Sequence, residues 1–292
     1  MRYYLRIMAK STKPRKGPVS KRAAKAPPIA HWSHSSLVAF LRNPLAWHKR
    51  YVEKIYDTPA NPSAVIGRAG HKALEHFYSG ADREVATRLG LEYLRAVPDL
   101  DLNFGKASSV RARKAKRLGM EADYLRAVGH YLERPPRHKV VAVELRGTVA
   151  VEGLPLPLTA VSDLVVESRA EPGAVDVVDH KFVETFSKGG ADKTLFVMQA
   201  LFNYYTVREL TGRSVRRFLV YECKKRKNAD GSAQLRRYVL DYATLDGEFE
   251  LFHRLIRDAT AEASRPRLWL PNPSDLFEGE HSFDLYRLGL VD

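Results

Sequence analysis

The chain has 292 residues and a formal net charge of +14, a length that allows one domain with a sizeable hydrophobic core. No apolar run approaches the ~20 residues that span a bilayer, and the first residues lack a secretory apolar core, so we expect no membrane segment. The single cysteine, Cys223, is typical of a reducing compartment, and we therefore expect a cytoplasmic location.

The positive charge is concentrated at the N-terminus. Residues 1–30 contain nine Lys or Arg and no acid, so the remaining 262 residues carry only 14 − 9 = +5. Residues 10–28 show no hydrophobic period, which predicts a disordered basic tail over residues 1–30. Attraction to nucleic acid is the functional interpretation that fits such a tail best, although basic tails also serve as solvated arms.

Hydrophobic periodicity predicts the order of the elements. We expect helices over residues 34–41, 44–56, 65–79, 82–96 and 107–132. We then expect strands over 139–151, 156–167 and 174–181, a helix over 192–211, strands over 216–223 and 234–241, and a helix over 243–263. This order predicts an α/β (α+β) fold in which a mixed sheet is flanked by helices, with an N-terminal helical elaboration. The domain would cover residues 31–265 with a helical insertion at about 80–135, followed by an irregular segment over 266–292 packed on it.

A carboxylate and a lysine stand side by side at the end of the expected strand 174–181. Because side chains alternate along a strand, Asp179 and Lys181 project from the same face. Asp163 lies in the preceding strand, and the turn-rich residues 168–173 would fold the two strands into a hairpin. Two carboxylates and an ammonium group suit phosphodiester cleavage, because acids hold a hard divalent cation and the lysine positions the attacking water. A solvated strand end is the alternative, since Asp-x-Lys alone is a weak motif.

Other elements add candidate polar residues to this set. His71 lies beside the apolar stripe of the helix 65–79, with Glu75 one turn further on, and a histidine hydrogen-bonded near the core is its alternative interpretation. Gln199 lies in the helix that follows Lys181. Glu144, in the strand 139–151, is a further candidate, although an outward-facing charge on an edge strand explains it equally well.

The order of these parts resembles the PD-(D/E)xK nuclease superfamily, in particular its RecB-like branch, which includes CRISPR-adaptation and phage recombination exonucleases. The similarity extends from about Trp32 to about Tyr238. Its first signature matches Ser33-His34-Ser35-Ser36-Leu37, Asn43-Pro44-Leu45-Ala46-Trp47-His48 and Tyr51. The Gly-x-x-x-His element, the second-motif aspartate and the Asp-x-Lys motif of the family match Gly67 to His71, Asp163, and Asp179 with Lys181.

The resemblance implies a restriction-endonuclease-like core and a metal-dependent deoxyribonuclease. The metal ligands would be His71, Asp163, Asp179 and the backbone carbonyl of His180. The ion would be Mg²⁺ or Mn²⁺, and an imidazole ligand shifts the preference towards Mn²⁺. The catalytic residues would be Asp163, Asp179, Lys181 and Gln199.

The chain departs from the RecB-like pattern at three places. Asn43 stands where many members have a cysteine, and a chain with only Cys223 cannot bind a four-cysteine iron–sulfur cluster by itself, so we expect no such cluster. Ala160 replaces a glycine that commonly precedes the aspartate by three residues. The glutamine and tyrosine of the family are usually four residues apart, so Asn203, Tyr204 and Tyr205 all remain candidates for the position that faces the site.

Two groups of residues are candidates for contacts with nucleic acid. A basic run next to the turn signal 228–231 would form a hairpin tip that contacts phosphates, or else a soluble turn; it consists of Lys224, Lys225, Arg226 and Lys227. Tyr204 would stack on a base or contact a phosphate, although aromatic residues in such a helix more often belong to the core.

These features together predict a DNA exonuclease that acts at single- or double-stranded ends in recombination, repair or phage DNA metabolism. The location would be the bacterial host cytoplasm if the protein is phage-encoded, and the partner would be a second copy of the chain or a recombination protein. One alternative is a structure- or sequence-specific endonuclease of the same fold. The other is a non-catalytic DNA-binding protein on a decayed nuclease fold.

Overall fold

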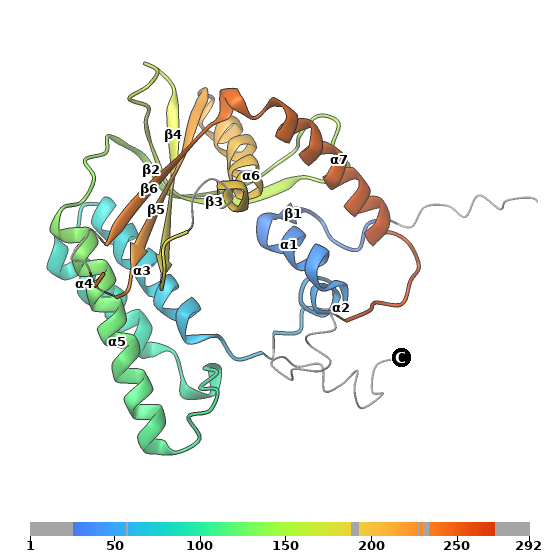
Figure 1. Ribbon diagram of the computed structural model, residues 1–292. Coiled ribbons are helices and arrows are strands. Elements are labelled where there is room, and N and C mark those ends of the chain that lie inside the picture. The colour runs from blue at the N-terminus through green and yellow to red at the C-terminus, as the bar shows by residue number, and fades with distance from the viewer. Residues whose placement is uncertain (1–25, 57, 188–192, 227, 230–233, 272–292) are drawn as a thin grey trace, which may run out of the picture.

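The computed structural model describes residues 26–56, 58–187, 193–226, 228–229 and 234–271. In this part of the chain, six strands form one mixed sheet with helices on both faces (Figure 1). The strands are β1 (Trp32–Ser33), β2 (Val140–Val149), β3 (Leu158–Glu167), β4 (Val175–Val183), β5 (Val215–Lys224) and β6 (Leu235–Asp241). The helices are α1 (His34–Arg42), α2 (Pro44–Trp47), η1 (His48–Val52), α3 (Pro62–Tyr78), α4 (Arg83–Ala96), η2 (Asp99–Asp101), α5 (Val110–Glu133), α6 (Lys193–Thr211), η3 (Tyr242–Thr244) and α7 (Asp246–Ala263).

The connections of the sheet follow from the turns and the crossover in the sequence. Strands β2, β3 and β4 are joined in antiparallel order, and the N–H of Ser168 donates to the carbonyl of Ala174 at 3.0 Å in the turn between β3 and β4. Strand β5 is parallel to β4, which requires a crossover connection, and α6 supplies it. Strand β6 pairs with β5 in antiparallel order. The predicted hairpin and the mixed sheet flanked by helices are thus confirmed.

Strands β3 and β4 are paired over only part of their length. Their last pair is Leu164 with Val178, whereas β4 stays paired with β5 as far as Val183. Strand β1 instead runs parallel to β3 at Leu158. In the register of the hairpin, the first residues past the last pair are Asp163 and Asp179, so the two strands separate where the two acids lie.

Both faces of the sheet are covered, which explains why the consecutive residues Val177 and Val178 of β4, on opposite faces, are both buried. Val178 belongs to a buried cluster with residues of α3 and α5, including Leu74 and Tyr131. Its neighbour Val177 belongs to a second cluster with residues of α6, including Phe196. Among the helices that the structure describes, none has the length and apolar composition needed to cross a membrane.

The segment after α1 differs from the expected helix over 44–56. Helix α2 is capped by the Asn43 side chain, which accepts from the N–H of Ala46 at 3.1 Å, and it continues only as the π-helix η1. Lys54 then adopts a left-handed conformation with φ of 62°, which ends the helical backbone. The ring of His48 stacks on Trp269 at 4.8 Å, so this segment is anchored by the chain that follows α7.

The packing of α3 against β4 depends on Gly70. A Cβ atom on Gly70 would meet the Phe182 ring at 2.3 Å, whereas one on Gly67 would meet nothing within 4 Å. We expect Gly70→Ala to lower the free energy of unfolding by about 1–3 kcal/mol through overpacking. The matched control Gly67→Ala should raise it by up to about 1 kcal/mol, because alanine favours the helix. Urea denaturation measures both changes, and equal stabilities of the two variants would contradict the packing argument.

Candidate active site

Asp163 of β3 is the centre of a cluster of nitrogen donors. Its Oδ2 accepts the backbone N–H of His180 at 2.7 Å and lies 3.1 Å from Nδ1 of His71 on α3. The Nδ1 atom of His180 lies 3.5 Å from the same oxygen. The backbone N–H of His180 points into the opening between β3 and β4, so a side-chain oxygen takes the place of a cross-strand carbonyl.

Asp179 of β4 is bound from its own strand and from α6. Its Oδ1 accepts from Nζ of Lys181 at 3.0 Å and from Nε2 of Gln199 at 2.6 Å. Its Oδ2 lies 2.8 Å from the same ammonium nitrogen, yet this buried oxygen makes no hydrogen bond to any residue that the structure describes. A buried carboxylate oxygen in this state is costly without a further cationic partner.

Glu144 of β2 completes this group from the opposite side of β3. Ligand atoms of His71, Glu144 and Asp163 all lie within 4.8 Å of one another, which suits a shared cation. The backbone of Glu144 has φ of 49°, a conformation that is uncommon for a residue other than glycine and often occurs at functional sites. Burial, followed by the charge of Asp163, raises the pKa of Glu144.

The two aspartates differ in their protonation behaviour. Burial opposes ionisation of Asp163, but His71 and the hydrogen bond from His180 outweigh it and hold the pKa of Asp163 well below its usual value. Burial raises the pKa of Asp179, against the effect of the nearby Lys181 ammonium, and the charge of Asp163 adds to the rise. Burial lowers the pKa of Lys181, but Asp179 and Asp163 together reverse this and raise it. Two acids in one site are thus held in different environments, which lower the pKa of Asp163 and raise the pKa of Asp179.

His180 fixes the floor of the site on the α3 side of the sheet. Its ring is only 1% exposed and lies between Tyr78 and Tyr221, with centroid distances of 6.1 and 6.0 Å. The hydroxyl of Tyr131 lies 2.9 Å from Nε2 of His180. Because N–H and C=O of a strand residue point to the same edge, the carbonyl of His180 also faces the opening beside Asp163.

Helix α6 presents Asn203, and not the following tyrosine, towards β3. The side chain of Asn203 accepts from the hydroxyl of Ser162 at 2.5 Å and donates to the carbonyl of Gln199 at 2.8 Å. The ring of Tyr204 is partly buried and packs against the core, on Tyr242 and Phe249 at 4.9 and 4.8 Å. Because one step along a helix turns a side chain by about 100°, it lies away from the position of Asn203, and its contact with nucleic acid stays a prediction.

The basic run after β5 is divided between the interior and the surface. Lys225 is 1% exposed, and its Nζ lies 3.1 Å from the hydroxyl of Ser63 and 3.3 Å from Glu184. A buried and paired ammonium is not available to a phosphate, which corrects the expectation for Lys225. Lys224 is partly buried and its Nζ bonds the side chain of Asn228, while Arg226 is exposed. Lys227 lies outside the described residues.

Comparison with known proteins adds to this geometry. A family model described as the PD-(D/E)XK nuclease superfamily matches residues 31–275. The chain belongs to this superfamily. The match agrees with the restriction-endonuclease-like α/β fold, whose mixed sheet carries the two acids of this PD-(D/E)XK protein where β3 and β4 separate.

Two further comparisons are less informative about this superfamily member. The crystal structure of SSO0001 is similar over 77% of this chain and 83% of that chain, with 15% sequence identity and a TM-score of 0.27. A likeness at this level supports no statement about function. The comparison with curated proteins finds no match.

Proposed function

We propose that this protein is a divalent-metal-dependent DNA exonuclease that hydrolyses phosphodiester bonds at DNA ends. The observation that carries the proposal is the convergence of Asp163, Asp179 and Lys181 at the point where β3 and β4 separate. A structural role alone would not explain a buried carboxylate, Asp179, and a partly buried one, Asp163, around an incomplete set of partners. Membership in a nuclease superfamily supports hydrolysis of nucleic acid as the chemistry.

The residues of the site fit a hard divalent cation. The Oδ2 atom of Asp179 lacks a hydrogen bond to the described residues, and His71, Glu144 and Asp163 bring their ligand atoms together. Asp163, Asp179, Glu144 and the carbonyl of His180 would supply oxygen ligands, and His71 would supply nitrogen, a set that suits Mg²⁺ or Mn²⁺. When bound, such an ion stabilises the charge on a phosphoryl oxygen and lowers the pKa of water.

Lys181 and Gln199 are placed to act on the reacting groups. The Lys181 side chain is 31% exposed while its ammonium is held by Asp179, so it combines a fixed position with access to solvent. We assign it the positioning of the attacking water and the stabilisation of charge on the phosphate. Gln199 donates to Oδ1 of Asp179, and this bond orients the carboxylate so that Oδ2 is left for the cation.

Two substitutions of Glu144 distinguish its contribution to metal binding from the strain of its backbone conformation. We expect Glu144→Gln to weaken Mn²⁺ binding by about ten- to a hundredfold, because an amide replaces a charged oxygen in the ligand cluster. Glu144→Gly should weaken Mn²⁺ binding as much. Its free energy of unfolding should nevertheless be about 1 kcal/mol higher than that of Glu144→Gln, because glycine adopts positive φ freely. Calorimetric titration and urea denaturation give the two quantities. Wild-type Mn²⁺ affinity in Glu144→Gln would remove Glu144 from the site.

The requirement for DNA ends distinguishes an exonuclease from an endonuclease. With Mg²⁺, linear DNA labelled at either terminus should be degraded progressively to short products, because the RecB-like resemblance favours capture of a strand end. A relaxed, covalently closed duplex circle of the same sequence should survive under the same conditions. Cleavage of the circle at discrete positions would instead establish a site-specific endonuclease. The assay uses Mg²⁺, since the looser geometric demands of Mn²⁺ often relax substrate choice.

A further inference from the structure

A cavity of about 410 Å³ lies at the end of the sheet where β4 begins. Its floor includes Leu219 and Tyr221 of β5, and one wall is the segment 136–139 that links α5 to β2. In Figure 1 this link is the green segment that leaves α5 and leads into β2 beside the sheet. The buried ring of His180, held between Tyr78 and Tyr221, separates the cavity from the metal-binding residues. The cavity is therefore a separate site.

The cavity has more positive charge than its own acids neutralise. Five cations line it, together with two carboxylates, so three positive charges are in excess; the cations are Arg137, Lys139, Arg169, Arg217 and Arg237. Glu167 pairs with Lys139 at 2.7 Å, and Asp176 pairs with Arg217 at 2.6 Å. The other three arginines have no carboxylate partner among the residues that the structure describes.

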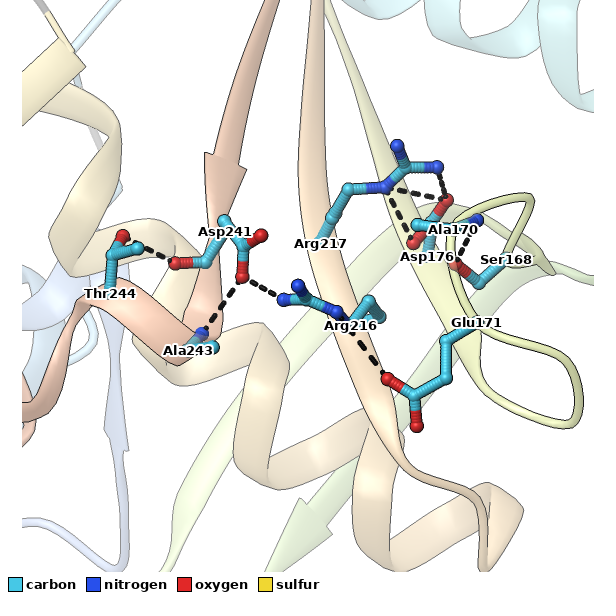
Figure 2. Close-up of polar contacts among 9 residues, drawn as sticks. All are labelled: Ser168, Ala170, Glu171, Asp176, Arg216, Arg217, Asp241, Ala243 and Thr244. Atoms are coloured by element: carbon cyan, nitrogen blue, oxygen red, sulfur yellow. Dashed lines mark hydrogen bonds and ion pairs between the residues drawn. The ribbon is translucent and has the colours of Figure 1, made fainter.

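Two neighbouring arginines of β5, Arg216 and Arg217, are each paired with carboxylates at this end of the sheet. Figure 2 shows Arg216 between Glu171 and Asp241, while Arg217 points the other way and binds Asp176. Arg217 uses Nε and Nη2 on this carboxylate, and no bond to a described residue is formed by its Nη1. A guanidinium group with a free donor at a cavity wall is suited to a second anion.

His138 adds an uncharged polar group to the same cavity. Its Nε2 is buried and has no hydrogen-bond partner within the described part of the chain. Burial, then the charges of His180 and Arg169, lower the pKa of His138 to about 4, so its ring is neutral at pH 7. A buried polar atom without a partner is costly, and a ligand would remove this cost if the ring turned Nε2 towards the cavity.

We propose that this cavity binds the phosphate group of a small phosphate-bearing molecule, of which a mononucleotide and inorganic phosphate are the two sources. Planar guanidinium groups match the oxygens of a phosphate. The exposed Arg137, Arg169 and Arg237 supply three charges that no acid among the described residues neutralises. The volume is within the range of small-molecule sites. The cavity shares no lining residue with the metal-binding candidates, which supports a ligand of its own.

The test is calorimetric titration of the full-length protein with inorganic phosphate and, separately, with deoxyadenosine monophosphate, in EDTA at constant ionic strength. We expect both ligands to bind one site, and Arg237→Ala to weaken the binding by about tenfold, the value of one charge-assisted hydrogen bond. Arg257→Ala removes an exposed arginine on α7 and serves as the matched control, with unchanged affinity. Tighter binding of the nucleotide would identify it as the source, and equal affinities would identify free phosphate.

Three results would overturn the proposal. The first is that neither ligand gives a binding isotherm. The second is that Arg237→Ala and Arg257→Ala have equal effects on the affinity. The third is that Lys181→Ala abolishes the binding, which would place the anion in the metal site. Because the titration is done without metal and without turnover, its failure leaves the proposed exonuclease intact. Conversely, a protein that cleaves no DNA would still show phosphate binding here if the cavity is the site.

Discussion

Asp179→Asn is expected to reduce DNA cleavage by at least about a thousandfold, which corresponds to about 4 kcal/mol of transition-state stabilisation. The substitution preserves the shape of the side chain but removes the charge at Oδ2, the buried oxygen that makes no hydrogen bond to the described residues. Asp163→Asn should have a similar effect, because this carboxylate faces His71 and Glu144. Initial rates on end-labelled linear DNA at saturating Mg²⁺ measure both losses.

Asp176 provides the matched control for this experiment. It lies three residues before Asp179 on β4, its side chain is 2% exposed against 5% for Asp179, and it is paired with Arg217. Asp176→Asn should therefore destabilise the protein by weakening a buried ion pair, while the folded protein keeps its cleavage rate. Retention of cleavage in Asp179→Asn, or equal loss in Asp176→Asn, would reject the assignment of the site.

Lys181→Met is expected to lower cleavage by about a hundred- to ten-thousandfold, while the protein still binds Mn²⁺. The ammonium group contacts Asp179 but contributes no lone pair to a cation, so its loss acts on water and phosphate. Lys181→Arg should also be inactive, because the guanidinium fork is larger and holds its proton permanently. Single-turnover rates and calorimetric titration with Mn²⁺ measure the two properties separately.

Two outcomes would contradict the role assigned to Lys181, which is to act on water and phosphate and not on the cation. If Lys181→Met loses Mn²⁺ affinity as strongly as Asp179→Asn does, the lysine supports the ligands and does not act on the water. If Lys181→Arg cleaves at the wild-type rate, a fixed positive charge is all that the site requires. Either result would contradict the assigned role.

The pairing of the acids was accessible from the sequence because it depends on local rules. Side-chain alternation places Asp179 and Lys181 on one face, and the turn residues 168–173 define the register that sets Asp163 opposite Asp179. The position of the Glu144 side chain could not be predicted from the sequence. It depends on a positive φ, and no turn residue in the sequence indicates this conformation. An isolated acid in an apolar strand was the only sequence signal for it.

Helical phase and tertiary burial account for the other differences. A shift of one residue decides that Asn203 bonds to Ser162 while Tyr204 packs against the core, and the usual spacing of the family's motif does not resolve that choice. Lys225 follows a strand in a basic run that resembles an exposed turn. Its burial depends on Ser63 and Glu184, which come from distant parts of the chain and become its partners only in the fold.

The partial separation of β3 and β4 assigns the two halves of the site to two different ribbons. Asp179 and Lys181 belong to β4, which is bonded to β5 along this stretch, whereas Asp163 and Glu144 belong to the β2–β3 ribbon. Across the opening, the main-chain donor of His180 is held by a side chain of the other ribbon instead of by a backbone carbonyl. An ion shared by both halves would therefore act as a cross-link within the sheet. Occupancy of the site would then make the sheet stiffer, because the two ribbons could no longer move apart.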